Sequence, residues 1–190
     1  MNLIHYKPQQ QILEPSAITV GSFDGVHLGH QSLFRKMNNY SKMTHCKSVV
    51  ITFNPHPQEV LQNKPDFFLI NSFEQILTLF EKFGMDIVYV IPFSEEFSKK
   101  TAEQFFEEYI FNSINVQAIF IGPNHHFGNQ REGDADTLAQ IGKKKNIELI
   151  KTQEFKIEGV EVRSTQIRKY LSQKDWTNAE RLMGHNLYNR

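Results

Sequence analysis

The sequence has almost no cysteine and no long apolar run. Cys46 is its single cysteine in 190 residues, so no disulfide can form within the chain, as is typical of a protein from a reducing compartment. No apolar run approaches the roughly 20 residues that a membrane-spanning helix needs. The N-terminal segment lacks the apolar stretch of a signal peptide. These absences exclude a disulfide scaffold and predict a soluble, cytoplasmic protein without membrane contact.

The sequence also has no excess of charge of either sign. Its 21 Lys and Arg residues balance its 21 Asp and Glu residues, for a formal net charge of zero. Binding to nucleic acid depends on excess positive charge, so the balance argues against such a partner. A local basic site for a phosphorylated small molecule is still compatible with it. The length suits one domain over residues 1–190, and the sequence does not determine the oligomeric state.

Short apolar runs alternate with segments of helical periodicity along the chain. We expect strands at 17–21, 47–53, 85–93, 117–122 and 147–150, and helices near 29–40, 72–83, 101–114, 135–145 and beyond 164. This alternation predicts an α/β fold in which helices cover both faces of a parallel sheet. Ligands bind such sheets at the carboxyl ends of the strands. Three polar loops follow predicted strands, at 21–30, 54–57 and 123–128, and should therefore meet at one edge.

The first of these loops, within V-G-S-F-D-G-V-H-L-G-H, concentrates glycine and histidine. Gly21 and Gly25 would let the backbone turn tightly and approach a ligand, and a helix N-terminus attracts phosphate. His27 and His30 would add donors aimed at the same anion. A metal site would need a third and a fourth ligand, and the histidines at 125–126 bring no recognised zinc pattern. Phosphate contact is therefore favoured over a metal site or a purely structural role.

A second polar cluster lies in V-R-S-T-Q-I-R, near the end of the sequence. Ser164 and Thr165 stand at an expected helix N-cap, and Arg168 follows one turn later on the same face. Two hydroxyls, free backbone amides and a guanidinium could hold a polyphosphate. A capping Ser-Thr pair beside a solvated arginine is also common, so this segment alone does not decide between the two interpretations.

The two remaining loops carry histidine beside proline or an aromatic ring. T-F-N-P-H-P, residues 52–57, contains two prolines that end a strand, and it places His56 at the same edge of the sheet. The simpler interpretation of this segment is a strand end with an exposed imidazole that has no function. G-P-N-H-H-F-G, residues 122–128, offers amide and imidazole donors beside Phe127, on which a flat ring system could stack. A plain loop is equally compatible with this second segment.

Taken in this order, the four segments resemble the adenylyltransferase module of bacterial FAD synthetases, which are bifunctional riboflavin kinases and FMN adenylyltransferases. H-L-G-H (27–30) is similar to the H-x-G-H signature of nucleotidyltransferases, and T-F-N-P-H-P to that family's T-F-x-P-H-P. The loop at 122–128 is similar to G-x-[DN]-x-x-F-G, and S-T-Q-I-R (164–168) to S-T-x-I-R. The resemblance covers roughly residues 15–185. It implies a Rossmann-like fold of the nucleotidyltransferase type and the reaction FMN + ATP → FAD + pyrophosphate.

The resemblance also implies roles for individual residues. His27 and His30 would be catalytic and would stabilise the α-phosphate in the transition state. The nucleotide and its phosphates would be bound by Gly21, Ser22, Phe23, Asp24, Ser164, Thr165 and Arg168. The flavin or its phosphate would be faced by Asn54, Pro55, His56, Pro57, Asn124, Phe127 and Gly128. Mg²⁺ would be carried by the ATP phosphates, with no metal site built from the protein alone.

Three features depart from the family pattern. Ser22 stands where the family usually has asparagine, and Arg163 stands where a serine usually precedes the Ser-Thr pair. The sequence also stops about where a riboflavin kinase domain would begin, so we expect no kinase activity. Two alternatives stay open: the same chemistry on phosphopantetheine or glycerol phosphate, and a non-catalytic module that binds flavin or nucleotide. The loops at 52–57 and 122–128 disfavour the first, and the intact histidines and S-T-Q-I-R disfavour the second.

Overall fold

A six-stranded, fully parallel sheet forms the centre of the computed structural model, which describes residues 1–62 and 66–187. Its strand order is β1-β4-β3-β2-β5-β6. The strands are β1 (Asn2–His5), β2 (Ile12–Val20), β3 (Lys47–Phe53), β4 (Ile87–Ile91), β5 (Ile114–Ile121) and β6 (Glu148–Lys151). Because β3, β2 and β5 are neighbours and run in one direction, the loops that follow them leave from the same edge. The predicted parallel α/β fold is confirmed.

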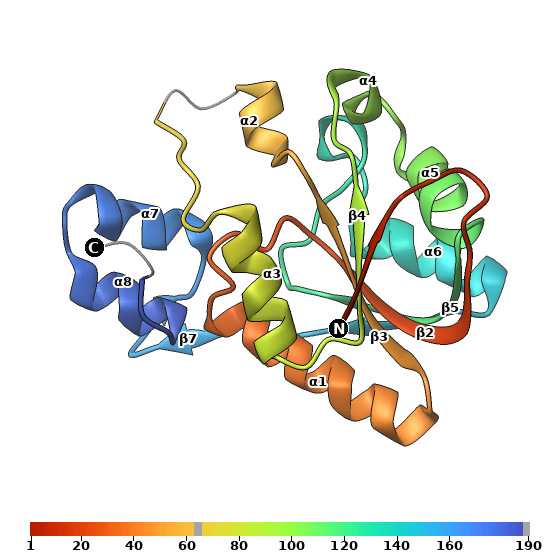
Figure 1. Cartoon of the computed structure of the whole chain (residues 1–190), viewed down its shortest axis with the longest axis horizontal. Coiled ribbons are helices and arrows are strands. Elements are labelled where there is room, and N and C mark those ends of the chain that lie inside the picture. Colours follow the sequence, from red (N-terminus) through yellow and green to blue (C-terminus); the bar gives the residue numbers. More distant parts are fainter. Residues whose placement is uncertain (63–65, 188–190) are drawn as a thin grey trace.

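Helices cover both faces of this sheet (Figure 1). One face packs on α1 (Leu28–Thr44) and α3 (Phe73–Lys82), and the other packs on α5 (Ala102–Phe105), the π-helix η1 (Phe106–Phe111) and α6 (Ala135–Lys145). Alternate side chains of a strand point to opposite faces. In β2, Ile18 therefore enters the core below α5 and α6, whereas Ala17 enters the core below α1 and α3. Short helices α2 (Pro57–Leu61), α4 (Glu95–Ser98) and η2 (Asn129–Arg131) lie in the connecting loops.

The C-terminal part forms a smaller layer at one end of the sheet (Figure 1). A two-stranded antiparallel hairpin, β7 (Lys156–Ile157) and β8 (Val160–Glu161), leads into α7 (Ser164–Ser172) and α8 (Trp176–Met183). The two helices share a third apolar cluster, centred on Ile167 and Leu182. Leu28, in the first turn of α1, packs against this cluster. The C-terminal helices are thereby in contact with the start of α1.

The sequence predicted most of these elements, and several boundaries agree. The strand at 47–53 and the helix at 135–145 have the predicted limits, and Ser72, Thr101 and Asp175 are the N-caps of α3, α5 and α8. Several expectations were wrong in extent, and the strand expected at 17–21 begins at Ile12. The helix expected at 101–114 ends at Phe111, and the strand expected from 117 already begins at Ile114. Strands β1, β7 and β8 were missed. Within the described residues, no helix has the length and apolar character needed to cross a bilayer.

The tight packing at Gly133 gives a first prediction. A Cβ at this position would lie 2.7 Å from the Phe127 ring and 2.9 Å from the Cβ of Ala102, whereas a Cβ at Gly122 would meet nothing within 4 Å. We therefore expect Gly133→Ala to lower the free energy of unfolding by about 1–3 kcal/mol through overpacking. Gly122→Ala should change it by less than about 0.5 kcal/mol. Urea unfolding of both variants measures this, and equal effects would contradict the packing described.

Candidate active site

Two histidines are stacked at the start of α1, directly after the glycine-rich loop. Their ring centroids are 3.6 Å apart and the planes are 16° from parallel. His27 is the N-cap of α1, and its Nδ1 accepts a hydrogen bond of 3.3 Å from the backbone N–H of His30. Because Nδ1 acts as the acceptor, the proton of the neutral imidazole is on Nε2. The cap therefore fixes the tautomer and leaves Nε2–H as a donor.

Both imidazoles are neutral at physiological pH. Burial lowers the pKa of His27 to about 4, a shift opposed by a backbone hydrogen bond and increased by the positive charge of Arg168. Burial also lowers the pKa of His30 well below its ordinary value, and the neighbouring His27 lowers it further. The Nδ1 atom of His30 is buried and has no hydrogen-bond partner among the described residues. Unpaired buried polar atoms are rare in folded proteins and mark candidate functional positions.

Two cavities meet beside the histidines, at the carboxyl ends of β2, β3 and β5. The smaller, of about 230 Å³, is lined by His27, His30 and Asn124. The larger, of about 520 Å³, is lined by His56 and Phe127. Four residues line both cavities: Val20, Gly21, Ser22 and His125. The three loops predicted to meet at one edge thus do so, and Ser22 lies where the two cavities join.

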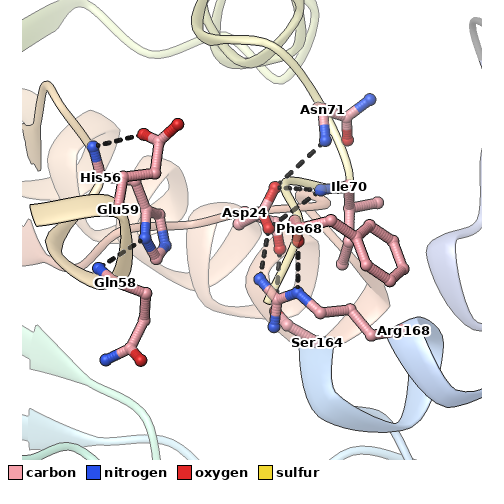
Figure 2. Close-up of polar contacts among 9 residues, drawn as sticks. All are labelled: Asp24, His56, Gln58, Glu59, Phe68, Ile70, Asn71, Ser164 and Arg168. Atoms are coloured by element: carbon pink, nitrogen blue, oxygen red, sulfur yellow. Dashed lines mark hydrogen bonds and ion pairs between the residues drawn. The ribbon is translucent and has the colours of Figure 1, made fainter. Parts of the chain in front are cut away.

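Asp24, in contrast, does not line either cavity and is engaged inside the protein (Figure 2). Its side chain is 2% exposed, forms an ion pair with Arg168 and accepts hydrogen bonds of 3.1 Å from the backbone N–H groups of Ile70 and Asn71. Ser164 Oγ donates to the backbone carbonyl of Asp24 at 2.8 Å. The structure therefore brings Asp24, Ser164 and Arg168 together. Their polar groups bind one another and do not point into either cavity.

The guanidinium of Arg168 has further partners in the segment that precedes α3. Its Nε donates to the Phe68 carbonyl at 2.8 Å, and its central carbon lies 4.5 Å from the centre of the Phe67 ring. The expected N-cap at Ser164 or Thr165 was wrong by one position. Arg163 is the N-cap of α7, without a capping side-chain bond, so Ser164 and the exposed Thr165 belong to the first turn.

His56 repeats the capping geometry of His27 at the start of α2. Its Nδ1 accepts from the backbone N–H of Gln58 at 3.1 Å, and Glu59 completes a capping box, so Nε2 again carries the proton. Burial lowers the pKa of His56, and the negative charge of Asp24 partly offsets that shift. Its ring stacks on Phe67 at 4.9 Å between centroids. The Asn54–Pro55 peptide bond that precedes it is cis.

Phe127 is the buried residue of the loop at 122–128, in which Asn124 and His126 are exposed. Phe127 is 8% exposed, packs edge-on against Phe106 and pairs through its backbone with Gly133. Its role as a stacking surface for a flat ring stays a prediction. The larger cavity has aromatic walls that sequence analysis missed: Phe53, Phe93, Phe97 and Phe105. Two of these rings stand at or just beyond the carboxyl ends of β3 and β4, and that position was the available signal.

Arg163 and Asn124 meet acidic side chains beside the smaller cavity. Arg163 forms ion pairs with Glu161 and Glu154, and the Asn124 carboxamide donates to Glu161 at 3.4 Å. The extra charge of Arg163, relative to the family pattern, is therefore balanced locally. Among the residues that the structure describes, no group of three or more His, Cys, Asp or Glu is arranged to hold a metal ion.

Comparison with known proteins identifies the family to which this arrangement belongs. A sequence model of the FAD synthetase family matches residues 9–166. The chain belongs to the FAD synthetase family. It is 32% identical over 176 residues to the bifunctional riboflavin kinase/FMN adenylyltransferase of Buchnera aphidicola subsp. Schizaphis graminum, covering 92% of this chain and 56% of that protein. The corresponding protein of Escherichia coli K12 is 28% identical over 172 residues, or 90% of this chain and 55% of the relative. The chain thus spans about half the length of these relatives.

Solved structures agree with the fold. A Streptococcus pneumoniae protein described as a macrolide-efflux protein superposes with a TM-score of 0.86 and 29% identity, over 98% of this chain and 61% of that one. The pantoate-β-alanine ligase of Francisella tularensis, complexed with a nucleotide and β-alanine, gives a TM-score of 0.50 at 15% identity, over 95% and 83% of the two chains. The second likeness shows a shared α/β fold.

The buried ion pair of this FAD synthetase-family chain gives a second prediction. In Asp24→Asn the Arg168 guanidinium keeps its buried position but loses its charge partner, so the free energy of unfolding should fall by about 3 kcal/mol or more. The matched control is Glu158→Gln, which breaks the ion pair with Arg181 at the surface, where the Glu158 side chain is 76% exposed. That change should cost less than about 1 kcal/mol. Chemical unfolding measures both variants. Equal losses of unfolding free energy would refute the description of Asp24 and Arg168 as a buried ion pair.

The low pKa of His27 gives a third prediction. Because its pKa falls from 6.5 to about 4 on folding, the unfolded state binds more protons between these values, and stability falls as the pH is lowered through this window. His27→Asn keeps an N-cap side chain but cannot titrate. Between pH values of about 7 and 4.5, the wild type should lose about 2–3 kcal/mol more stability than the variant. Urea unfolding at both pH values measures the difference, and parallel losses would count against the burial of a neutral His27.

Proposed function

We propose that this chain is an FMN adenylyltransferase that transfers AMP from ATP to FMN, giving FAD and pyrophosphate. The observation that carries the proposal is the stacked pair of neutral histidines in the wall of a cavity that shares four lining residues with a second, larger cavity. The reaction joins two flat, bulky substrates at one phosphate, so it needs two adjoining cavities and donors at the point where they meet. Membership of the FAD synthetase family and the names of the relatives support the same reaction.

The reaction needs no general base in the protein. The second pKa of a phosphate monoester is about 6, so the FMN phosphate is largely a dianion near neutral pH. One of its oxygens forms a bond to the α-phosphorus of ATP while the bond from that phosphorus to the bridging oxygen breaks. Pyrophosphate leaves with the electron pair. Catalysis then requires alignment of the two phosphates and dispersal of negative charge.

The fixed tautomer of His27 suits the second requirement. Its Nε2–H is a donor held in place by the cap of α1, and its neutrality avoids tight electrostatic binding of the ground-state phosphate. We assign His27 and His30 to the α-phosphate, and the smaller cavity, including Gly21 and Ser22, to the adenine nucleotide. The leaving β- and γ-phosphates are assigned to the first turn of α7, where Thr165 is exposed. Asp24, Ser164 and Arg168 shape this region from behind the cavity wall, and Phe23 lines the smaller cavity.

The larger cavity suits the flavin. Its aromatic walls match a flat, largely apolar ring system, and His56 with its Nε2–H is part of its lining. We assign Pro57, Phe127 and Gly128, which also line it, to the same substrate. Of the other residues expected to face the flavin, Asn54 and Pro55 line neither cavity and Asn124 lines the smaller one. Mg²⁺ would arrive with the phosphates of ATP and would neutralise the charge that develops on them. We further propose that the activity is cytoplasmic and resides in this single domain.

Purified chain incubated with FMN, ATP and Mg²⁺ tests the reaction directly. FAD and pyrophosphate should form in equal amounts, and omission of Mg²⁺ should abolish the product. A panel that replaces FMN by phosphopantetheine or glycerol phosphate, and ATP by CTP, should give no product. Binding of FMN and ATP without turnover would instead indicate a non-catalytic module, and product from another phosphate would indicate a different nucleotidyltransferase.

His30→Ala gives the fourth prediction. Loss of one preorganised donor at the transferred phosphate should lower kcat by about 10²–10³ while the affinity for ATP changes little. His5→Ala is a matched histidine control, because His5 lies exposed on the edge strand β1 and outside both cavities. Steady-state kinetics of FAD formation measures both variants. A His30→Ala enzyme with kcat within a few-fold of wild type would remove this residue from the mechanism.

A further inference from the structure

The loop that precedes His27 adopts a backbone conformation that its residues rarely take. Phe23 and Val26 have positive φ values of 51° and 38°. Such values are uncommon outside glycine, and for a β-branched residue such as valine they are unusual. A conformation of this kind persists only when its surroundings hold it in place. The contacts that hold it therefore determine where His27 lies.

Three consecutive carbonyl groups of this loop are held by side chains. Asp24 O accepts from Ser164 Oγ at 2.8 Å, and Val26 O accepts from Gln31 Nε2 at 2.9 Å. Gly25 O lies 2.9 Å from His185 Nε2. A carbonyl oxygen can only accept, so a hydrogen bond here requires the proton to be on Nε2 of His185.

The C-terminus of α8 is in tight contact with the same region. Gln31 Nε2 donates a second hydrogen bond, of 2.6 Å, to Met183 O in the last turn of α8. Gly184, which ends α8 with a φ of 68°, approaches α1 so closely that a Cβ there would lie 2.4 Å from Leu28 Cδ2. His185 follows immediately. Its ring is therefore anchored against the start of α1 as well as on the loop.

We propose that the end of α8 acts as a brace for the glycine-rich loop and that His185 is a positioning residue for His27. The bond to Gly25 O fixes the loop two residues before His27. The N-cap geometry of His27, and with it the direction of Nε2–H, depends on that fixed backbone. The inference rests on the proposed adenylyl transfer for its kinetic consequence but concerns residues outside both cavities.

Two amide substitutions at position 185 separate this role from general stabilisation. In His185→Gln the amide nitrogen is as many bonds from Cα as Nε2 is, so it can donate to Gly25 O. In His185→Asn the amide reaches only the position of Nδ1, which faces the carbonyl of Asn186 at 3.1 Å. The control is Arg181→Ala. Arg181 lies on α8, and its removal breaks only the surface pair with Glu158 and leaves the brace intact.

We expect kcat for FAD formation to fall about ten- to a hundredfold in His185→Asn, because a small misplacement of a catalytic group costs that much, with KM values within about twofold of wild type. His185→Gln and Arg181→Ala should stay within about threefold of the wild-type kcat. Equal kcat for the Gln and Asn variants, whether both normal or both reduced, would overturn the proposal. So would a change confined to KM.

A second readout does not depend on catalysis, so failure of the proposed reaction can be told apart from failure of the brace. An NMR titration of the 190-residue chain follows the pKa of His27, which is about 4 in the braced loop. In His185→Asn the loosened loop admits water, and this pKa should rise toward 6.5, whereas His185→Gln should leave it unchanged. An unchanged pKa of His27 in both variants would refute the brace even if the wild type forms no FAD.

Discussion

The buried ion pair of Asp24 and Arg168 connects the three parts of the molecule on which the site depends. Asp24 lies in the glycine-rich loop, and Arg168 lies 144 residues later in α7. Ile70 and Asn71, in the segment before α3, donate backbone hydrogen bonds to the same carboxylate. A carboxylate in this position is stable only because its cationic partner and backbone donors replace lost water. The pair and the bond from Ser164 thereby hold S-T-Q-I-R against the glycine-rich loop.

Burial determines the chemistry of the histidines, because it is the main reason why His27 and His30 stay neutral. Arg168 adds to this effect for His27 because its positive charge opposes a second cation nearby. The N-cap bond then selects the Nε2–H tautomer. A neutral donor of fixed direction, with no competing water, is the preorganised arrangement that stabilises charge developing on a transferred phosphate.

Sequence periodicity predicted the sheet, the order of the main helices and the edge at which the loops meet, because each of these depends on local patterns. The two-residue strands β7 and β8 are too short to show a period, and β1 is an exposed edge strand without an apolar run. The spacing of Ser164, Thr165 and Arg168 is the same whether the guanidinium faces a phosphate or a distant carboxylate, so the ion pair could not be predicted. The phenylalanines of the larger cavity are indistinguishable from core residues until the sheet edge is placed.

A crystal structure with FMN, Mg²⁺ and a non-hydrolysable ATP analogue tests the central claim most directly. An α-phosphate oxygen should lie about 3 Å from His27 Nε2, a typical hydrogen-bond distance. The isoalloxazine ring should occupy the cavity of about 520 Å³, and the contact between Asp24 and Arg168 should stay intact. A nucleotide bound with its α-phosphate away from both imidazoles, or a flavin bound outside that cavity, would contradict the central claim.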